Sequence, residues 1–498
     1  MVQKGLVSEM LTGVWRIKWY KYRWPLFAAL VINVLLINHF VWEIPLNPFG
    51  APRILETPDS TSTAPGATTP SKDSKTGSQT ETEEYKPIFS QSLLDAPPST
   101  PALLNIHDFD FNGPYVGWPL ARACNETTYH PGLIFVCDNN SGGIGNIRNF
   151  ILTCIRYAID AGASGIILPK IQRRSDTDLA NIFTTGLQPF DYFFDEDHFR
   201  YAMETYCPQM TIYDEATDIP NTEKKREKKE FYPKDLNLDL DGCDGRGVNR
   251  HLDMFRPKFD EWLKVQKVIP TVEEPTTVRF KWATFFEWPI YRDGPEFAAT
   301  FGDLLRIRKD VQELAAKTIV EMSKFVGVEP DPKYETLNTP YLGVHLRTES
   351  DALGFWPNYD QQTAGYLEAA QKNGLKHAYL ACGNATDGHR FAEQAHAKMG
   401  MNMTSKLDLL KGDDLKRLTD LSWDQQALVD FLVLQKSTHF TGCSFSSFTM
   451  NIAIKRHLMT GGIASRAWKS PGDEFSTLVG RFESWYGDWM FMYECMWP

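Results

Sequence analysis

The sequence predicts an α/β protein with two Rossmann-like lobes that face a cleft, preceded by a single transmembrane helix and a disordered stalk. Short apolar runs followed by a turn and an amphipathic helix occur twice, near residues 132–169 and 341–458. A long loop-rich section lies between them, and an apolar segment followed by a polar, Ser/Thr/Pro-rich segment precedes both. Ligands of such sheets bind beyond the carboxyl ends of the strands, so we expect the functional site there.

Charge excludes one class of partner. The chain has 498 residues, a formal net charge of −11 and a pI of about 5.6. Proteins that follow a nucleic-acid backbone need a basic surface to displace its counterions. We therefore expect no nucleic-acid partner.

The N-terminus resembles a membrane anchor. Pro25–Trp42 carries no formally charged residue and is long enough to cross a bilayer core of ~30 Å. The basic residues that precede it are Lys4, Arg16, Lys18, Lys21 and Arg23, whereas Glu43 follows it. This asymmetry predicts a cytosolic tail (1–24), a type II signal anchor (25–42) and a luminal remainder in the ER or Golgi. A cleavable signal peptide is the alternative.

Residues 43–103 are expected to form the stalk. Glu56–Glu84 is rich in Thr, Ser, Pro and Gly and has almost no large apolar residue, so it cannot bury enough surface to fold. Four N-glycosylation triplets fit a luminal location, and they begin at Asn125, Asn139, Asn384 and Asn402.

Eight cysteines fit an oxidising compartment, and no C-x-x-C pair suggests zinc. We expect Cys124 to pair with Cys137 and Cys207 with Cys243. Cys154 falls on the apolar side of a predicted helix and is expected to be a free buried thiol.

The N-terminal lobe is predicted over 104–335. Gly132–Cys137 is a continuous apolar run typical of a buried parallel strand. Apolar residues then recur at helical spacing from residue 147 to a stop at Ala161-Gly162, and Gly165–Pro169 is a second strand, which completes a right-handed βαβ unit. Residues 170–300 are expected to be loop-rich, with 223–230 (EKKREKKE) as a solvated loop, and 303–327 to be helical.

The C-terminal lobe is predicted over 336–498. Its expected strands are Tyr341–Leu346 and Lys376–Cys382. Helices are expected to end at Ala369–Gly374 and to cover Arg390–Met399 and Asp424–Leu434. Thr438–Leu458 predicts a strand, a Ser-rich turn and a helix.

Three loops carry residues suited to an anionic ligand. The first, CDNNSGGIGNIRNF (137–150), has Gly142, Gly143 and Gly145 before a helix, with Asn146 and Arg148 as side-chain donors. It is not a dinucleotide fingerprint, because Arg148 stands where a third glycine is needed, and no P-loop lysine follows. An anion at the helix N-terminus and a plain tight turn both remain open.

The second and third loops follow the strands of the C-terminal lobe. His345 to Asp351 (HLRTESD) presents His345, Arg347, Glu349 and Asp351 after a strand, and an arginine there can hold a phosphate with two parallel hydrogen bonds. A surface salt-bridge cluster is the alternative. In Thr441–Ala453, Ser446 and Ser447 suit either helix capping or a diphosphate.

His-Leu-Arg-x-Glu-x-Asp at 345–351 resembles the signature of the O-fucosyltransferase superfamily, which are GDP-fucose-using enzymes of GT-B fold. Gly-Gly-x-Gly-Asn-x-Arg at 142–148 is similar to their N-terminal glycine-rich motif, and Ser446-Ser447-Phe448 resembles their late motif at the nucleotide diphosphate. Asp430 matches an acidic position near the guanine. The motifs occur in family order.

The resemblance implies a division of roles. Arg347 would bind the donor phosphates and promote departure of GDP, with Asn146, Glu349 and Asp351 as further catalytic candidates. The donor-binding set would be Gly142, Gly143, Gly145, Arg148, His345, Asp430, Ser446, Ser447 and Phe448. Some relatives carry a glutamate base where this chain has Gly143, so Glu349, Asp351 or a water held by Asn146 are the candidate bases.

The resemblance also implies an inverting displacement that requires no metal or other cofactor beyond the donor substrate. The D-x-D triplets at 176–178 and 239–241 are not expected to bind metal. The predicted function is transfer of fucose from GDP-fucose to a protein or glycan hydroxyl. Alternatives are a GT-B enzyme that uses another nucleotide sugar, an inactive glycan-binding pseudoenzyme, and a structural adhesion protein.

Overall fold

The structure, a computed structural model, describes residues 106–498 except 177, 180, 183–184, 223–228, 237–251, 283–287, 333–338, 353, 462–472 and 481–494. The predicted tail, anchor and stalk (1–24, 25–42 and 43–103) lie outside the described residues, as do 223–228 of the expected solvated loop. In the part that is described, no helix is long and apolar enough to cross a membrane.

The N-terminal lobe is built on a five-stranded parallel sheet. Its strands are β1 (His130–Val136), β2 (Ala163–Ile167), β5 (Thr211–Tyr213), β6 (Lys229–Phe231) and β7 (Thr276–Phe280). They lie in the order β5-β2-β1-β7-β6, and every neighbouring pair is parallel. Consecutive residues Leu133–Val136 of the central strand are all buried, because both faces of the sheet are covered.

Helices and short elements complete this lobe. The α-helices are α2 (Trp118–Asn125), α3 (Ile144–Ala161), α4 (Glu196–Tyr206), α5 (Leu252–Val265) and α6 (Pro295–Thr300). A two-stranded antiparallel sheet joins β3 (Ile171–Gln172) to β4 (Leu187–Gln188). The short 3₁₀ helices are η2 (Ile106–Asp108), η3 (Phe190–Tyr192), η4 (Ala216–Asp218), η5 (Pro233–Leu236), η6 (Ile290–Asp293) and η7 (Phe301–Leu304).

The predicted β-α-β order of this lobe is confirmed. The strands predicted at 132–137 and 165–169 are β1 and β2, and the helix between them is α3. Gly162 ends α3 with φ +70°, and its N–H donates to the carbonyls of Ala158 and Ile159. Residues 170–300, expected to be loop-rich, also supply three of the five strands and α4 to α6, which were not predicted. β5 and β6 have only three residues each, too few for a periodic pattern.

The C-terminal lobe contains a second five-stranded parallel sheet. Its strands are β8 (Leu342–His345), β9 (His377–Ala381), β10 (Asn402–Thr404), β11 (His439–Cys443) and β12 (Ser476–Val479). They lie in the order β10-β9-β8-β11-β12. β8, β9 and β11 were predicted from the sequence, whereas β10 and β12 were not.

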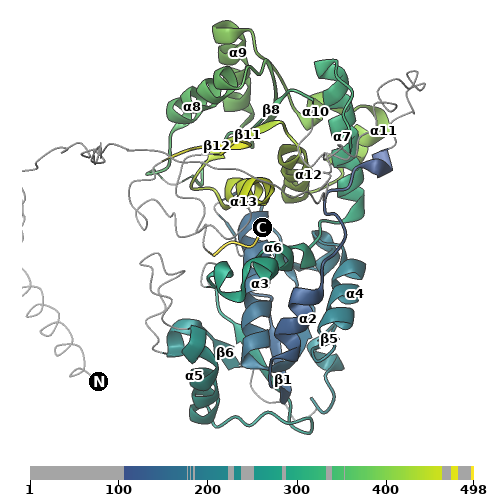
Figure 1. Cartoon of the computed structure of the whole chain (residues 1–498), viewed down its shortest axis with the longest axis vertical. Helices are drawn as coiled ribbons and strands as arrows, with labels where there is room; N and C mark the ends of the chain where they lie inside the picture. The colour runs from purple at the N-terminus through teal and green to yellow at the C-terminus, as the bar shows by residue number, and fades with distance from the viewer. Residues whose placement is uncertain are drawn as a thin grey trace, which may run out of the picture. The chain divides into compact units, whose positions relative to one another are not determined.

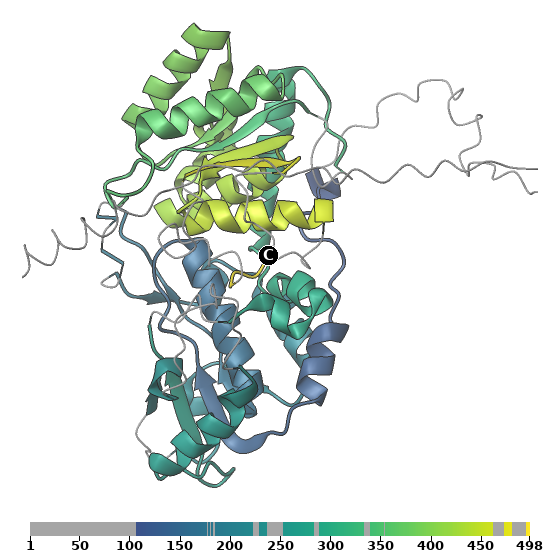
Figure 2. The same cartoon turned by 60° about the vertical axis from the view of Figure 1, so that its left-hand side comes forward.

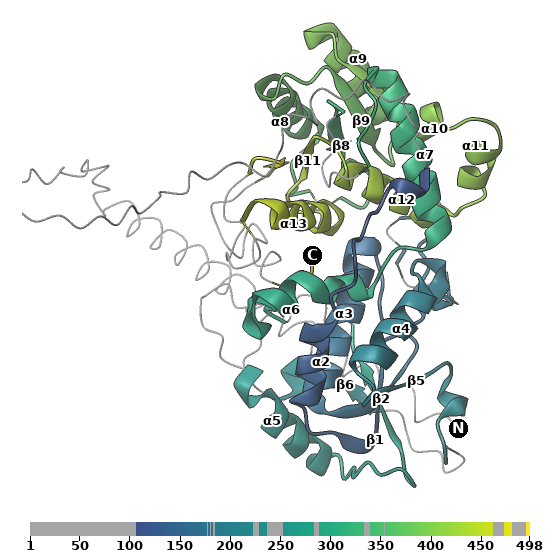
Figure 3. The ribbon, with the colours of Figure 1, turned by 45° about the vertical axis from the view of Figure 1, so that its right-hand side comes forward.

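The helices of this lobe are α7 (Lys309–Val326), α8 (Tyr359–Lys372), α9 (Ala385–Met399), α10 (Lys406–Leu409), α11 (Gly412–Thr419), α12 (Trp423–Gln435) and α13 (Ser447–Gly461). α8 packs on β11 and β12, and α12 and α13 pack on the other side of the sheet, as Figures 1 and 3 show. α7 was predicted at 303–327 and placed in the first lobe, but it packs on α12.

The described residues belong to one compact unit. α13 of the C-terminal lobe packs against α3 of the N-terminal lobe, and Figure 2 shows α13 (yellow-green) lying across, just above the upper end of α3 (blue). α3 follows β1, the central strand of its sheet, and α13 follows β11, which lies next to the central strand β8. The loops between strand and helix are therefore brought together.

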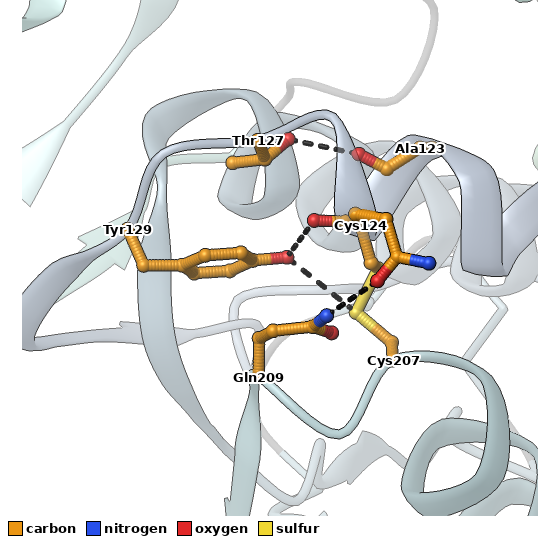
Figure 4. Close-up of a disulfide and its surroundings, with 7 residues drawn as sticks. Ala123, Cys124, Thr127, Tyr129, Cys207 and Gln209 are labelled. Carbon is orange, nitrogen blue, oxygen red and sulfur yellow. Dashed lines mark hydrogen bonds between the residues drawn. A yellow bond between two sulfur atoms is a disulfide. The ribbon is translucent and has the colours of Figure 1, made fainter.

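The disulfides differ from those expected. Cys124 pairs with Cys207, which joins the ends of α2 and α4 (Figure 4), and Cys137 pairs with Cys154, which joins the end of β1 to α3. The predicted pairs Cys124–Cys137 and Cys207–Cys243, and the free Cys154, are therefore wrong. α3 folds back along β1 and places Cys154 with its Cα 5.8 Å from that of Cys137, which spacing alone does not reveal.

The Cys124–Cys207 bridge is held by polar neighbours. In Figure 4 the Tyr129 phenol points at the bridge, and its Oη donates a hydrogen bond of 3.1 Å to the carbonyl of Cys124. Gln209 Nε2 donates to Asn125 Oδ1 at 2.7 Å. Cys495 is also disulfide-bonded, and in the described part Cys382 and Cys443 are free.

Candidate active site

The candidate site is formed by the loops that follow β1, β8 and β11. Each of these strands lies at or next to the centre of its parallel sheet, and each loop leaves from a carboxyl end. This is the edge at which parallel α/β sheets bind ligands. The three predicted motifs occupy these three loops.

The glycine-rich loop needs its glycines for two different reasons. Gly142 has φ +94°, a left-handed conformation that side chains rarely adopt. A Cβ at Gly145 would lie 2.5 Å from the carbonyl oxygen of Ser447. The first and third motifs are therefore in direct contact, and α3 begins against α13.

The other residues of this loop start α3. Gly143 is the N-cap of α3, in extended conformation, and its carbonyl accepts from the N–H groups of Asn146 and Ile147. The Asn146 side chain is half-buried and has no hydrogen-bond partner among the described residues. It is thus available to a ligand or a water.

Arg148 has a structural role in this conformation. It is buried, and its Nη1 donates to Asn451 Oδ1 at 3.0 Å and to the carbonyl of Trp497 at 2.6 Å. Its Nη2 donates to the carbonyl of Pro498 at 2.5 Å. Burial lowers the pKa of Arg148 to about 10. Its predicted donor contact would require it to leave these partners.

Arg347 is held at the end of β8. Its Nη1 donates to Glu349 Oε2 at 2.5 Å and its Nη2 to Asp351 Oδ2 at 2.7 Å. Gln362 accepts from the backbone N–H of Arg347 at 2.9 Å and donates to its carbonyl at 2.8 Å. Burial lowers the pKa of Arg347, but the two carboxylates outweigh burial and raise it. The guanidinium therefore stays charged.

Glu349 and Asp351 differ in how many of their carboxylate oxygens accept hydrogen bonds. Glu349 uses both oxygens, since Oε1 accepts from the N–H of Gly383 at 2.7 Å. Asp351 has one buried oxygen, Oδ1, with no hydrogen-bond partner in the described part of the chain. Burial raises the pKa of Asp351, but Arg347 and Arg174 outweigh it and lower the pKa.

Arg174 is the residue that the sequence analysis missed. It is buried, it forms an ion pair with Asp351 Oδ2, the oxygen that Arg347 also uses, and its Nη1 would lie 3.8 Å from a Cβ at Gly143. Its backbone N–H donates to Asp424 Oδ2 at 3.1 Å. Arg174 therefore links the glycine-rich loop to the β8 loop. The signal that could have found it is the pair Arg173-Arg174 directly after a strand.

His345 joins the second motif to the third. Its Nδ1 lies 2.7 Å from Thr449 Oγ1, and its ring lies 4.5 Å from that of Phe448. Burial lowers the pKa of His345 to about 3, and the charge of Arg347 acts in the same direction. The imidazole is thus neutral. Ser446 is buried at the N-cap position of α13, and Ser447 begins this helix.

Asp430 is already paired. Tyr379 Oη donates to its Oδ1 at 2.7 Å, and Lys406 Nζ forms an ion pair with Oδ2. It lies within α12 and is buried. Its predicted contact with the guanine would require one of these partners to move.

The described residues contain no group of three or more His, Cys, Asp or Glu side chains that could hold a metal ion. In the first D-x-D triplet, Asp176 pairs with Arg173 and accepts from the N–H of Trp423 at 3.0 Å. The second triplet, 239–241, lies outside the described residues.

Three solved structures illustrate what the chain is similar to. POFUT1 in complex with GDP aligns with 71% of this chain and 100% of its own, at 14% identity and a TM-score of 0.41. An arginine-to-lysine mutant of Arabidopsis thaliana FUT1 in complex with GDP aligns with 68% and 71%, at 11% identity and 0.34. NodZ alpha-1,6-fucosyltransferase co-crystallized with GDP aligns with 64% and 90%, at 13% identity and 0.34.

Among curated proteins, no sequence matches the chain significantly. The sequence profile of the family described as GDP-fucose protein O-fucosyltransferase, by contrast, matches residues 133–459. The matched range begins in β1, ends within α13 and includes all three motifs. The chain belongs to the GDP-fucose protein O-fucosyltransferase family and is a glycosyltransferase.

Proposed function

We propose that the chain is an inverting glycosyltransferase of GT-B architecture, which transfers fucose from GDP-fucose to a hydroxyl of a protein or glycan in the secretory pathway. The observation that carries the proposal is the meeting of Arg347 and Arg174 on one oxygen of Asp351, beside Gly143. Two guanidinium groups that converge on one oxygen atom can bind the oxygens of a diphosphate in its place, because each can donate paired hydrogen bonds.

The donor would replace the carboxylates as the partner of the arginines. In the absence of a ligand, buried guanidinium groups need an anionic partner, and Glu349 and Asp351 supply it. A bound diphosphate would take over the two Nη groups of Arg347. Fixed positive charge at this position stabilises the negative charge that develops on departing GDP, without reorganisation during the reaction.

Asp351 is the candidate base that the geometry favours. Gly143 has no side chain, and both oxygens of Glu349 are engaged. Asp351 keeps one oxygen unpaired among the described residues, although its lowered pKa makes it a weak base while both arginines bind it. If both arginines bound the diphosphate instead, the pKa of Asp351 would rise, because burial raises it and the arginines would no longer lower it. Water held by Asn146 is the second candidate.

The secretory location rests on the sequence of residues 1–103 and on chemistry in the folded part. Disulfides persist in the ER lumen and beyond, whereas cytosolic thiols are kept reduced. The bridges Cys124–Cys207 and Cys137–Cys154 support a luminal folded part. The proposed orientation is that of a single-pass type II membrane protein.

Donor binding tests the proposal directly. Titration of the purified full chain with GDP-fucose in a calorimeter should give saturable binding, and GDP should compete. Slow hydrolysis of GDP-fucose without an acceptor should also be detectable. Tight binding of UDP-sugars with no binding of GDP-fucose would refute the donor assignment.

Arg347→Ala tests the role of the arginine. We expect turnover to fall ~100-fold or more, about 3 kcal/mol of transition-state stabilisation, while the fold is kept. The matched control is Arg122→Ala, since Arg122 is exposed and forms a solvent-exposed ion pair with Glu126, the C-cap residue of its own helix. If Arg347→Ala turned over donor at the normal rate, Arg347 would be a structural residue.

A further inference from the structure

An open pocket of about 550 Å³ adjoins the candidate site. It is lined by Arg173, Asp176 and Tyr192 of the N-terminal lobe and by residues between Asp420 and Gln426 of the C-terminal lobe. Its volume lies in the range of pockets that bind small molecules. We call it the interlobe pocket. The described residues that line it lie outside the three motifs.

One wall of the pocket, Trp423, lies close to residues of the candidate site. A Cβ at Gly383 would lie 3.0 Å from Cζ2 of Trp423, which lines the pocket, and 2.5 Å from Oε1 of Glu349. The guanidinium of Arg174 lies 5.5 Å from the centroid of the Trp423 ring. Trp423 therefore links the pocket to Glu349 and Arg174, which lie near this ring but are not among the described residues that line the pocket.

The strand order separates the pocket from the loops that are expected to bind the donor. The expected donor loops follow β8 and β11, which are neighbours in the sheet. The pocket wall meets Gly383, which follows β9, on the opposite side of β8 from β11. A donor held by the β8 and β11 loops and a second substrate in the pocket can thus bind at the same time.

The wall of the pocket is fixed before any ligand binds. Tyr192 Oη lies 2.6 Å from Ser422 Oγ and donates to Asp424 Oδ1 at 2.7 Å. Gln425 Nε2 donates to the carbonyl of Tyr192 at 2.9 Å. Because these side chains are already ordered, binding costs little conformational entropy in the protein.

The lining selects a class of ligand. Among the described residues, it contains one cation, Arg173, which pairs with Asp176, and a second carboxylate, Asp420. The described lining thus has no net positive charge, which disfavours phosphorylated or acidic ligands. Tyr192 and Trp423 offer aromatic surface, and Gln426 adds a planar side-chain amide. Aromatic rings next to carboxylates and amides suit a sugar, which has apolar ring faces and hydroxyl edges.

We propose that the interlobe pocket binds neutral sugar residues of a glycan acceptor, with Trp423 as the stacking surface. The inference rests on the proposed function, since it names the acceptor class of that reaction as a glycan rather than a folded protein domain. The acceptor hydroxyl would approach the donor past Glu349 and Arg174. Arg173, Asp420 and Gln426 would hold the sugar hydroxyls.

The test uses the full chain and four neutral trisaccharides: mannotriose, cellotriose, maltotriose and chitotriose. Saturation-transfer NMR and calorimetry should detect binding of at least one of them, and saturating GDP should not displace it. Trp423→Ala should weaken that binding at least tenfold and leave GDP-fucose affinity unchanged. Trp118→Ala is the matched control, because Trp118 is an exposed tryptophan of α2, 51% accessible.

A second variant keeps the test decisive if Trp423→Ala fails to fold. Gln426→Ala removes an amide whose Nε2 bonds only to the carbonyl of Leu421 among the described residues, and should weaken sugar binding severalfold. The inference is overturned if none of the trisaccharides binds a chain that binds GDP-fucose, if GDP displaces them, or if both variants bind normally. Acceptance of a folded protein domain alone would overturn it too. Trp423-dependent sugar binding without GDP-fucose binding would support the pocket and refute the proposed donor.

Discussion

Arg347, the proposed donor-binding residue, illustrates how a buried cation is kept in place when no ligand is bound. Its side chain is only 13% exposed, so an unpaired charge there would be strongly unfavourable. Glu349 and Asp351 remove that cost and fix the guanidinium in one orientation. A diphosphate then gains a preorganised partner but must compete with two carboxylates. Donor affinity therefore depends on how much more strongly Arg347 binds the diphosphate than it binds Glu349 and Asp351.

His345 should make the folded state sensitive to acid. Its pKa is lowered to about 3 by burial, whereas an unfolded histidine titrates near ~6.5. Between these values the unfolded chain binds a proton that the folded chain does not, so stability falls as pH decreases below ~6.5. At pH 5 the loss from this residue is expected to be about 2 kcal/mol.

Urea unfolding of the wild type and of His345→Gln at pH 7 and pH 5 measures this effect. The variant should lose part of the acid sensitivity and keep the remainder, since burial also lowers the pKa of His439, to about 4. His389→Gln, at an exposed position of α9, should retain the wild-type pH profile. Equal slopes for wild type and His345→Gln would show that His345 does not contribute.

At the scale of elements, the start of α3 against α13 is the contact that joins the first and third motifs. Gly145→Ala would place a methyl group 2.5 Å from the backbone oxygen of Ser447, so one helix must move. Such overpacking typically costs about 1–3 kcal/mol. We expect lower thermal stability and weaker GDP-fucose binding, both measurable by scanning fluorimetry with and without donor.

Gly388→Ala is the control for this substitution. Gly388 lies inside α9, and a Cβ there makes only ordinary contacts, the nearest at 3.6 Å. Alanine favours a helix over glycine by up to ~1 kcal/mol, so this variant should be as stable as the wild type or more stable. Normal donor binding by Gly145→Ala would contradict the close approach of the two helices.

Elements with strong patterns were predictable from the sequence. α3 carries apolar residues on nearly every turn and ends at a left-handed glycine, and β8, β9 and β11 are short segments that are wholly or mostly buried. β5, β6 and β10 were missed, because three residues do not establish a period. Their place comes from pairing with β2, β7 and β9, a long-range property that local sequence does not record.

The same limit applies to the candidate site. The loop positions of Arg347, Ser446 and the glycines follow from local motifs. The pair Arg173-Arg174 after a strand marks Arg174 as a candidate, but its ion pair with Asp351 could not be predicted, since the two positions are 177 residues apart. The motif predicts that Arg148 donates hydrogen bonds to a ligand. In the structure its guanidinium donates them instead to the backbone oxygens of Trp497 and Pro498. Only the assembled fold distinguishes these two arginines.

At the scale of the whole molecule, the Cys137–Cys154 disulfide encloses the glycine-rich loop. The loop that it closes spans 17 residues, and a bridge of this size contributes about 3 kcal/mol in the chain-entropy description. Replacing both cysteines by serine should lower the free energy of unfolding by about that amount. It should also weaken GDP-fucose binding at temperatures where the variant is still folded.

The Cys124–Cys207 pair provides the comparison. This bridge joins α2 to α4, away from the three motif loops, so its double serine variant should lose stability but bind GDP-fucose as the wild type does. Denaturant titration and calorimetry on both variants separate the two effects. Identical donor affinity in the two variants would show that the bridge beside the glycine-rich loop has no role in shaping it.

The position of the Cys137–Cys154 bridge also bears on how an assay is to be interpreted. Protein made in a bacterial cytoplasm, or kept in dithiothreitol, would lack the covalent tie behind the glycine-rich loop. Such a sample could fail to turn over GDP-fucose and be mistaken for a pseudoenzyme. The free thiol of Cys443 needs no reductant, because it is buried and burial raises its pKa to about 12. Secreted protein handled without thiols is the preparation in which a negative result would be informative.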